Sequence, residues 1–176
     1  MRPFIARAFA LILLMAFASM LPGCGDGKAA ATFNDNIVRS LQRLNTVGQK
    51  FGRTIEPLSQ GENANPALVR QAHDESVEVL TAIKAEMTTW KIPARESAQQ
   101  LNQSFVNMMK NQEGAIALFG DVTKVVEDTK LANNVRSQRI AEIFKNLEGS
   151  EQAALSDLQA KQRAFAKDHN IKLITK

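Results

Sequence analysis

Apolar side chains recur every three or four residues along most of this chain, and this spacing constrains the fold more than any other feature. Such spacing keeps one face of an α-helix apolar, because about 3.6 residues make one turn. The first apolar face consists of Phe33, Ile37, Leu41, Leu44, Gly48, Phe51, Ile55 and Leu58. We expect this helix to end near Glu56, because Pro57 disfavours helical geometry in the residue before it.

Three further segments carry the same spacing. A second helix is predicted to start at Asn65 and Pro66, because an asparagine side chain caps a first turn and proline fits the first helical position. A third helix is predicted from Ala94 to Thr129. A fourth is expected after the turn "LANN" at 131–134, and it ends around "DHN" before the tail 171–176.

These segments predict an all-α fold. The chain has no tyrosine and is rich in Ala, Leu, Gln, Lys and Glu, which favour helices. Four amphipathic helices with short connections predict an antiparallel up-down four-helix bundle over residues 33–170. The third and fourth helices are the longest, so we expect them to project as a coiled-coil hairpin. The alternative is an elongated coiled coil that completes its core as a homo-oligomer.

The first 23 residues have the layout of a secretory signal peptide. Arg2 and Arg7 supply positive charge, the uncharged stretch "AFALILLMAFASML" follows, and small residues precede Cys24. The apolar stretch is shorter than the roughly 20 residues that a membrane-spanning helix needs. We therefore expect residues 1–23 to be removed rather than to stay as a membrane span.

The residues Leu21, Pro22, Gly23 and Cys24 resemble the lipobox of bacterial lipoproteins. The resemblance implies that the Cys24 thiol carries a diacylglyceryl group, that the chain is cut before it, and that the new amino terminus is acylated, with palmitate as a typical acyl chain. Residues 24–32 then form a lipidated flexible tether, and these acyl chains are the only cofactor-like groups expected. Gly25 rather than aspartate follows the cysteine, which by resemblance favours the outer membrane, facing the periplasm, over the inner membrane.

An ordinary free cysteine behind the signal peptide is the alternative interpretation of Cys24. It is the only cysteine of the chain, so it has no partner for an intramolecular disulfide. An unpaired thiol in a secreted protein calls for an explanation, and lipidation supplies one.

The chain lacks the patterns of common catalytic and metal sites. A di-iron bundle site needs glutamate three residues before histidine, but Arg70 precedes His73 and Ala166 precedes His169 at that spacing. Two distant histidines do not make a zinc site, and Met108 and other core-spaced methionines are typical of packing. We therefore predict no catalytic residue, no metal and no enzymatic activity.

A basic stripe marks the first predicted helix. Its members are Arg39, Arg43, Lys50 and Arg53. At about 100° per residue they cluster opposite the apolar face, so we expect them to face water. They form either a solvated surface or a contact with an anionic surface or an acidic partner. Nucleic-acid binding is not expected, because the net charge is only +4 and two arginines lie in the leader.

Together these features predict a non-enzymatic, lipid-anchored helical protein of the bacterial cell envelope that acts as a scaffold or adaptor for an unknown envelope partner. The alternative is a periplasmic carrier or sensor that encloses an apolar small molecule between its helices. The candidate lining residues for that alternative are Phe51, Phe105, Met108, Phe119 and Phe144. Trp90, close to Pro93, is expected to plug one end of the bundle, whereas an exposed tryptophan there would indicate a docking site.

Overall fold

The computed structural model describes residues 17–18, 26–145 and 148–174, and these are helical, as the sequence predicts, apart from connections and one pair of two-residue strands. Its helices are α2 (Asp26–Ser59), α3 (Pro66–Met87), α4 (Glu96–Glu127), α5 (Asn133–Lys145) and α6 (Glu148–Asp168). Two short strands, β1 (Phe17–Ala18) and β2 (Leu173–Ile174), pair antiparallel, with Phe17 opposite Ile174. Strand β1 lies within the predicted signal peptide.

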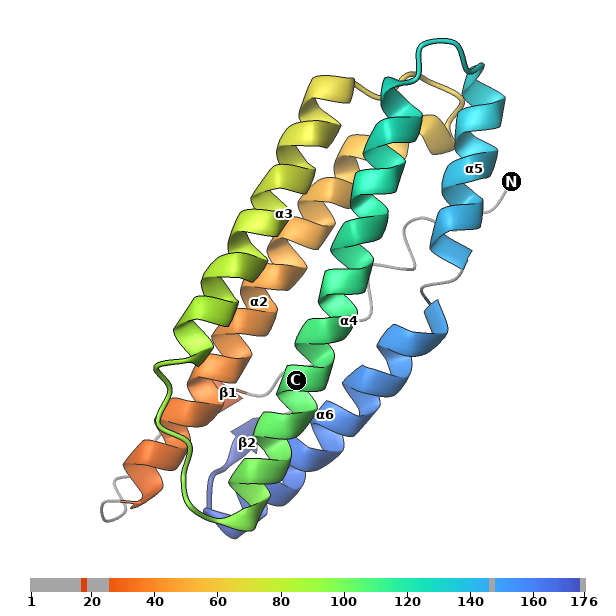
Figure 1. Cartoon of the computed structure of the whole chain (residues 1–176). Helices are drawn as coiled ribbons and strands as arrows, with labels where there is room; N and C mark the ends of the chain where they lie inside the picture. The colour runs from red at the N-terminus through yellow and green to blue at the C-terminus, as the bar shows by residue number, and fades with distance from the viewer. Residues whose placement is uncertain (1–16, 19–25, 146–147, 175–176) are drawn as a thin grey trace.

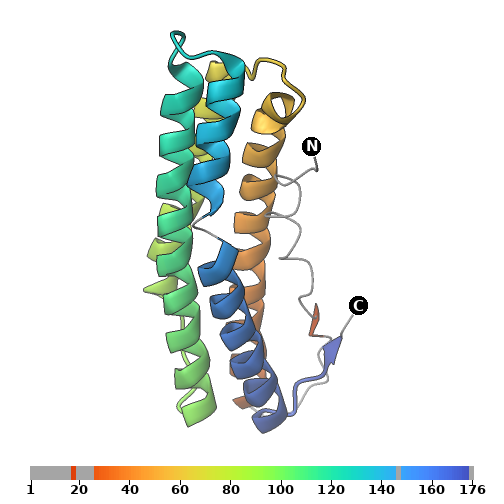
Figure 2. The same ribbon diagram turned by 90° about the vertical axis from the view of Figure 1, so that its right-hand side faces the viewer.

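The helices lie along one another and enclose a common apolar interior. Helix α3 packs against both α2 and α4, and α6 packs along α4 (Figure 1). Helices α5 and α6 follow one another along α4, with α5 near the end of the molecule where α2 ends and α6 near the end where α2 begins (Figure 2). Helix α5 also contacts α2.

The predicted apolar faces form the core. The buried side chains of the first face are Phe33, Ile37, Leu41, Leu44, Phe51, Ile55 and Leu58. Rings from different helices meet inside: Phe51 and Phe119 stack with centroids 4.1 Å apart. Trp90 stacks on Phe105 at 5.5 Å and meets Phe33 edge-on at 6.2 Å. Trp90 therefore closes one end of the core, as expected from the sequence.

The start of α2 corrects the predicted tether. The helix begins at Asp26, so residues 26–32, expected to be part of a flexible tether, form its first turns. The alanines at 29–31 favour a helix, and Ala30 and Ala31 are buried against the core. Because these small side chains are buried, the helix starts before Phe33, the first residue of the predicted apolar face.

The end of α2 also differs from the prediction. The helix continues past Glu56 and includes Pro57 in its last turn. It ends in a Schellman motif, in which Gly61 has the positive φ of 81° that glycine adopts without strain. The N–H of Gly61 donates to the Leu58 carbonyl at 3.2 Å, and the N–H of Glu62 donates to the Pro57 carbonyl at 3.0 Å. The proline restricts the residue before it, but burial of Leu58 holds the last turn in place.

The predicted start of α3 is confirmed. Asn65 has extended backbone geometry, and its side-chain oxygen accepts a hydrogen bond from the Ala67 N–H at 3.0 Å. Pro66 occupies the first helical position. This cap satisfies a first-turn N–H group that the helix itself leaves without a partner.

The predictions of a single fourth helix and of a projecting hairpin are wrong. The structure divides the predicted fourth segment into two helices: α5 ends at Lys145 and α6 begins at Glu148. Leu147, which continues the apolar spacing of Ile140 and Ile143 in the sequence, lies outside the described residues. Helix α2 has 34 residues and α4 has 32, so the hairpin of the third and fourth segments is not longer than the first helix.

Candidate functional site

Cys24, the predicted lipidation site, lies outside the described residues, as does the predicted cleavage position before it. Helix α2 begins at Asp26, two positions further along the chain. Two residues of extended chain span at most about 7 Å. Asp26, the first residue of α2, therefore lies within that distance of Cys24 along the chain.

An open groove of about 600 Å³ lies beside these first turns. It is formed where the beginning of α2 meets the end of α3 and the residues that follow it. The lining residues are Lys28, Ala29, Thr32, Phe33, Asn36, Glu86, Thr89, Trp90 and Lys91. Sequence reasoning missed this groove, because it depends on the packing of two segments far apart in the chain.

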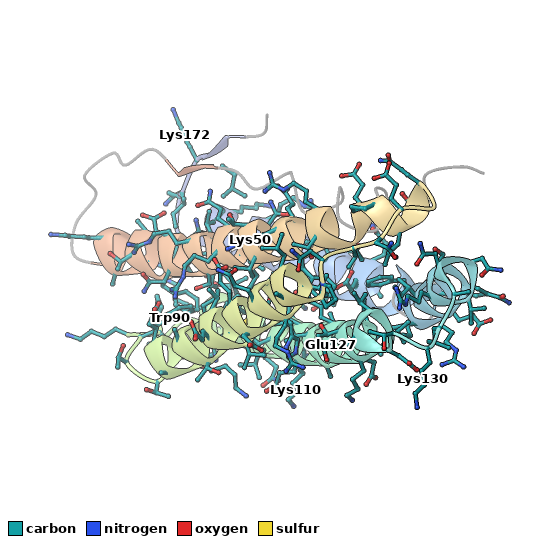
Figure 3. The ribbon with its side chains drawn as sticks, turned by 90° about the horizontal axis from the view of Figure 1, so that it is seen from above. Lys50, Trp90, Lys110, Glu127, Lys130 and Lys172 are labelled. Carbon is teal, nitrogen blue, oxygen red and sulfur yellow. The ribbon has the colours of Figure 1, made fainter. Side chains whose placement is uncertain are left out.

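The groove has a positive balance of charge. Lys28 and Lys91 are exposed, and the ammonium group of neither lysine pairs with a carboxylate among the described residues. The carboxylate of Glu86 is occupied by Arg43, whose Nη1 donates to its two oxygens at 2.7 and 2.9 Å. The half-buried ring of Trp90 lies at this end of the molecule (Figure 3). The groove thus combines two available cations with an aromatic surface.

The basic stripe is divided between two environments. Arg43 pairs with Glu86 and Lys50 pairs with Glu75, and both carboxylates belong to α3. These two side chains stay partly exposed to water, at 39% and 43%, but they also contact the neighbouring helix, which the sequence did not predict. The two glutamates are eleven positions apart, about three helical turns, so one side of α3 places both opposite the basic residues of α2.

The outer members of the stripe remain exposed. Nη2 of Arg39 donates to Oδ1 of Asn36 at 2.7 Å within the same helix, and Nε of Arg53 donates to the Gln49 carbonyl at 3.4 Å. Partial burial raises the pKa of Asp35, while the nearby Arg39 guanidinium opposes that rise. Of the four members of the stripe, Arg39 and Arg53 are thus available to a partner without breaking a contact to α3.

The candidate lining residues of a carrier are packed into the core. The side chains of Phe51, Phe105, Met108, Phe119 and Phe144 are all buried. Phe119 also lines a cavity of about 20 Å³, which is room for a single water molecule. These five residues fill the interior in this structure.

Polar side chains line part of that small cavity. Ser76, Gln112 and Glu151 contribute to its wall. Nε2 of Gln112 donates to Oε1 of Glu151 at 3.4 Å. Burial raises the pKa of Glu151, and the hydrogen bond from Gln112 acts in the opposite direction. Gln112 interrupts the apolar spacing of the third predicted segment, but no local pattern identifies Glu151 as its partner.

The buried guanidinium of Arg136 was also missed. Its Nε and Nη2 donate to the Asp128 carbonyl at 3.2 and 2.7 Å, and its Nη1 donates to Oδ1 of Asn133 at 3.3 Å. It therefore caps the carboxyl end of α4, where cations are favoured. The sequence did contain a signal for this role. Arg136 lies four residues before Ile140 and eight before Phe144, so the spacing of the helix places this basic residue on the inward face.

Neither a metal-binding cluster nor a membrane-spanning helix occurs in the part of the chain that the structure describes. Within those ranges, no group of three or more His, Cys, Asp or Glu side chains is arranged to hold a metal ion. None of the helices described is long and apolar enough to cross a membrane. Comparisons with models of protein families, with curated proteins and with solved structures find no match.

Proposed function

We propose that this chain is a lipoprotein of the bacterial cell envelope that holds a rigid helical rod at a membrane surface, as a scaffold or adaptor without enzymatic activity. One observation carries the proposal. The lipobox-like residues Leu21 to Cys24 end two positions before the first residue of α2, so the proposed anchor leads directly into the folded domain.

The acyl chains on Cys24 supply the attachment. Each buried methylene contributes about 0.8 kcal/mol, and one chain alone binds only marginally, whereas two or three chains give lasting attachment. The resemblance favours the outer membrane, because Gly25 rather than aspartate follows the cysteine. The domain then faces the periplasm.

The proposed architecture is an up-down antiparallel bundle of four rods, in which α5 and α6 together form the fourth. At 1.5 Å per residue, α2 extends roughly 50 Å from the anchored end. Such a rod presents long outer faces to an envelope partner at a defined height above the membrane. Arg39 and Arg53 are exposed on one of these faces and suit an acidic partner.

The packing of the interior supports this function over that of a carrier. The stacked rings of Phe51 and Phe119 and the edge-on contact of Phe119 with Phe144 occupy the space that an apolar ligand needs. A carrier function requires these contacts to open.

Replacement of Cys24 tests the proposal. Mass spectrometry of the native protein should show an amino-terminal cysteine with a diacylglyceryl group and an added acyl chain. A Cys24→Ala variant should lose acyl labelling. Because an uncut leader can itself hold the variant at a membrane, the same variant is also made behind a conventionally cleaved signal peptide, and that form should be released into the soluble fraction.

A Lys110→Ala variant behind the native leader, changed at an exposed position outside the basic stripe, serves as the control and should keep both the acyl groups and the membrane association. An unmodified thiol in the native protein would contradict the anchor. Membrane association of the conventionally secreted alanine variant at the native level would also contradict it.

A further inference from the structure

We infer that the groove between the start of α2 and the end of α3 binds the phosphate-bearing headgroup of an anionic phospholipid in the membrane that holds the protein. The inference rests on the proposed lipid anchor at Cys24 and adds a second, non-covalent contact to the same bilayer. Its residues are Lys28 on α2, and Trp90 and Lys91 after α3.

The position of the groove follows from the length of chain between the anchor and the helix. Cys24 and Asp26 are separated by at most about 7 Å of extended chain. Lys28 lies two residues further along the helix, a rise of about 3 Å. The headgroup layer on each side of a bilayer is roughly 5–8 Å thick. A flexible tether of the predicted length would allow the domain to move away from this layer, but the helix that starts at Asp26 keeps the groove beside it.

The charges of the groove suit a phosphate group. Lys28 and Lys91 are exposed and have no carboxylate partner among the described residues, and a lysine ammonium binds phosphate as a point charge. The one carboxylate in the lining, Glu86, is neutralised by Arg43 through two hydrogen bonds. The groove therefore offers an uncompensated positive charge to an anionic ligand.

The aromatic side chain suits the same location. Tryptophan is favoured at the boundary between headgroups and hydrocarbon, because its ring is apolar and its N–H is polar. Trp90 is half-buried, with Phe105 stacked on one side at 5.5 Å. It lines the groove together with the two lysines, so the polar and aromatic contacts face the same ligand. A membrane lipid provides both kinds of surface.

The single tryptophan makes the groove directly observable. Trp90 is the only tryptophan of the chain, so intrinsic tryptophan fluorescence reports on this site alone. The full protein, purified from cells that process its native leader, is reconstituted into vesicles of phosphatidylcholine, or of phosphatidylcholine with one quarter phosphatidylglycerol. Quenching of Trp90 by acrylamide, which carries no charge, is measured in both. Each basic residue near an anionic surface strengthens contact about fivefold, so the two lysines should hold the groove against the headgroups. The headgroups then shield part of the Trp90 ring from acrylamide, and we expect the quenching constant to fall about twofold in the anionic vesicles.

Two matched double variants carry the same change of charge. Lys28→Glu with Lys91→Glu should abolish the difference between the two kinds of vesicle. Lys110→Glu with Lys130→Glu should keep the difference between the two kinds of vesicle, because these lysines lie away from Trp90. Lys130 lies at the opposite end of the molecule (Figure 3). Circular dichroism confirms that all forms are helical. Equal quenching of the native protein in both vesicles, or loss of the difference in both double variants, overturns the inference.

Two further arms of the experiment distinguish a lipid headgroup from a soluble anion, and the groove from the anchor. Inorganic phosphate added to the phosphatidylcholine vesicles should not protect Trp90. Equal protection by free phosphate would assign the groove to a soluble anion instead. Mass spectrometry of the same samples reports the state of Cys24 independently. A lipidated Cys24 without selective protection rejects the groove and keeps the anchor, whereas selective protection with an unmodified Cys24 rejects the anchor and keeps the groove.

Discussion

Gln162 of α6 donates a hydrogen bond from Nε2 to Oδ1 of Asn34 in α2 at 2.8 Å, and both side chains are buried. The two residues are 128 positions apart. Nδ2 of Asn34 has no hydrogen-bond partner among the described residues. A buried amide left without a partner is costly, whereas replacing both partners by apolar groups can be nearly neutral. The hydrogen bond therefore links α2 to α6, but we expect it to make the protein little more stable than a pair of apolar side chains would.

Substitution of this pair should be strongly non-additive. Asn34→Leu leaves the Gln162 amide buried without a partner and should lower the free energy of unfolding by about 1–3 kcal/mol. The double variant Asn34→Leu with Gln162→Leu should lose less than the sum of the two single variants. Urea unfolding followed by circular dichroism measures all four proteins. Additive losses would show that the two amides do not interact.

Truncation of Phe119 should be among the most destabilising changes in the core. Its ring stacks on Phe51 at 4.1 Å and meets Phe144 edge-on at 6.4 Å, so three helices lose contacts together. We expect Phe119→Ala to lower the free energy of unfolding by about 3–5 kcal/mol. Lys110→Ala, an exposed change in the same helix, should stay within about 0.5 kcal/mol. A loss below about 1 kcal/mol for Phe119→Ala would contradict a fully packed interior.

Removal of the Arg136 guanidinium should weaken the end of the molecule where α4 turns into α5. The change Arg136→Met keeps much of the side-chain volume but removes two of the hydrogen bonds to the Asp128 carbonyl, which keeps the one from the Leu131 N–H at 3.2 Å. Loss of such charge-assisted bonds at this partly buried position costs about 1.5–3 kcal/mol. Arg139→Met, at an exposed position of the same helix, should be nearly neutral. Thermal unfolding of both variants makes the comparison, and equal effects would contradict the capping role.

The sequence predicted the helices well wherever local chemistry decides the outcome. The spacing from Phe33 to Leu58 identified buried side chains, and Asn65 with Pro66 identified the start of α3. It failed where packing between distant segments decides. The alanines before Phe33 carry too little apolar surface to mark a face by themselves, yet burial against the core extends α2 to Asp26.

The candidate site divides in the same way. The period of α2 placed Arg43 and Lys50 on one side of the helix, but no local pattern says that α3 presents Glu86 and Glu75 to that side. The groove around Trp90 likewise requires the end of α3 beside the start of α2. Such pairings depend on tertiary packing, which the period of a single helix does not encode.

The half-buried carboxyl of Glu151 should make the stability depend on pH. Burial raises its pKa above the usual 4.5, so the folded state binds this proton more tightly than the unfolded state does. The free energy of unfolding should therefore fall as the pH rises from the usual pKa through the raised one. Glu151→Gln stays neutral and should be more stable than the native protein at pH 7 but not at pH 4.

Other carboxylates change with pH in both proteins, so the difference between them isolates Glu151. The hydrogen bond from Ser97 lowers the pKa of Asp168, which contributes stability above its usual 3.8 that is lost as the pH falls through the lowered pKa. Asp168 is unchanged in the Glu151→Gln variant, so this effect cancels. Urea unfolding at pH 4, 5, 6 and 7 measures the difference, with the exposed change Glu142→Gln as the control. A difference that is the same at every pH would mean that Glu151 ionises as easily in the folded chain as in the unfolded one.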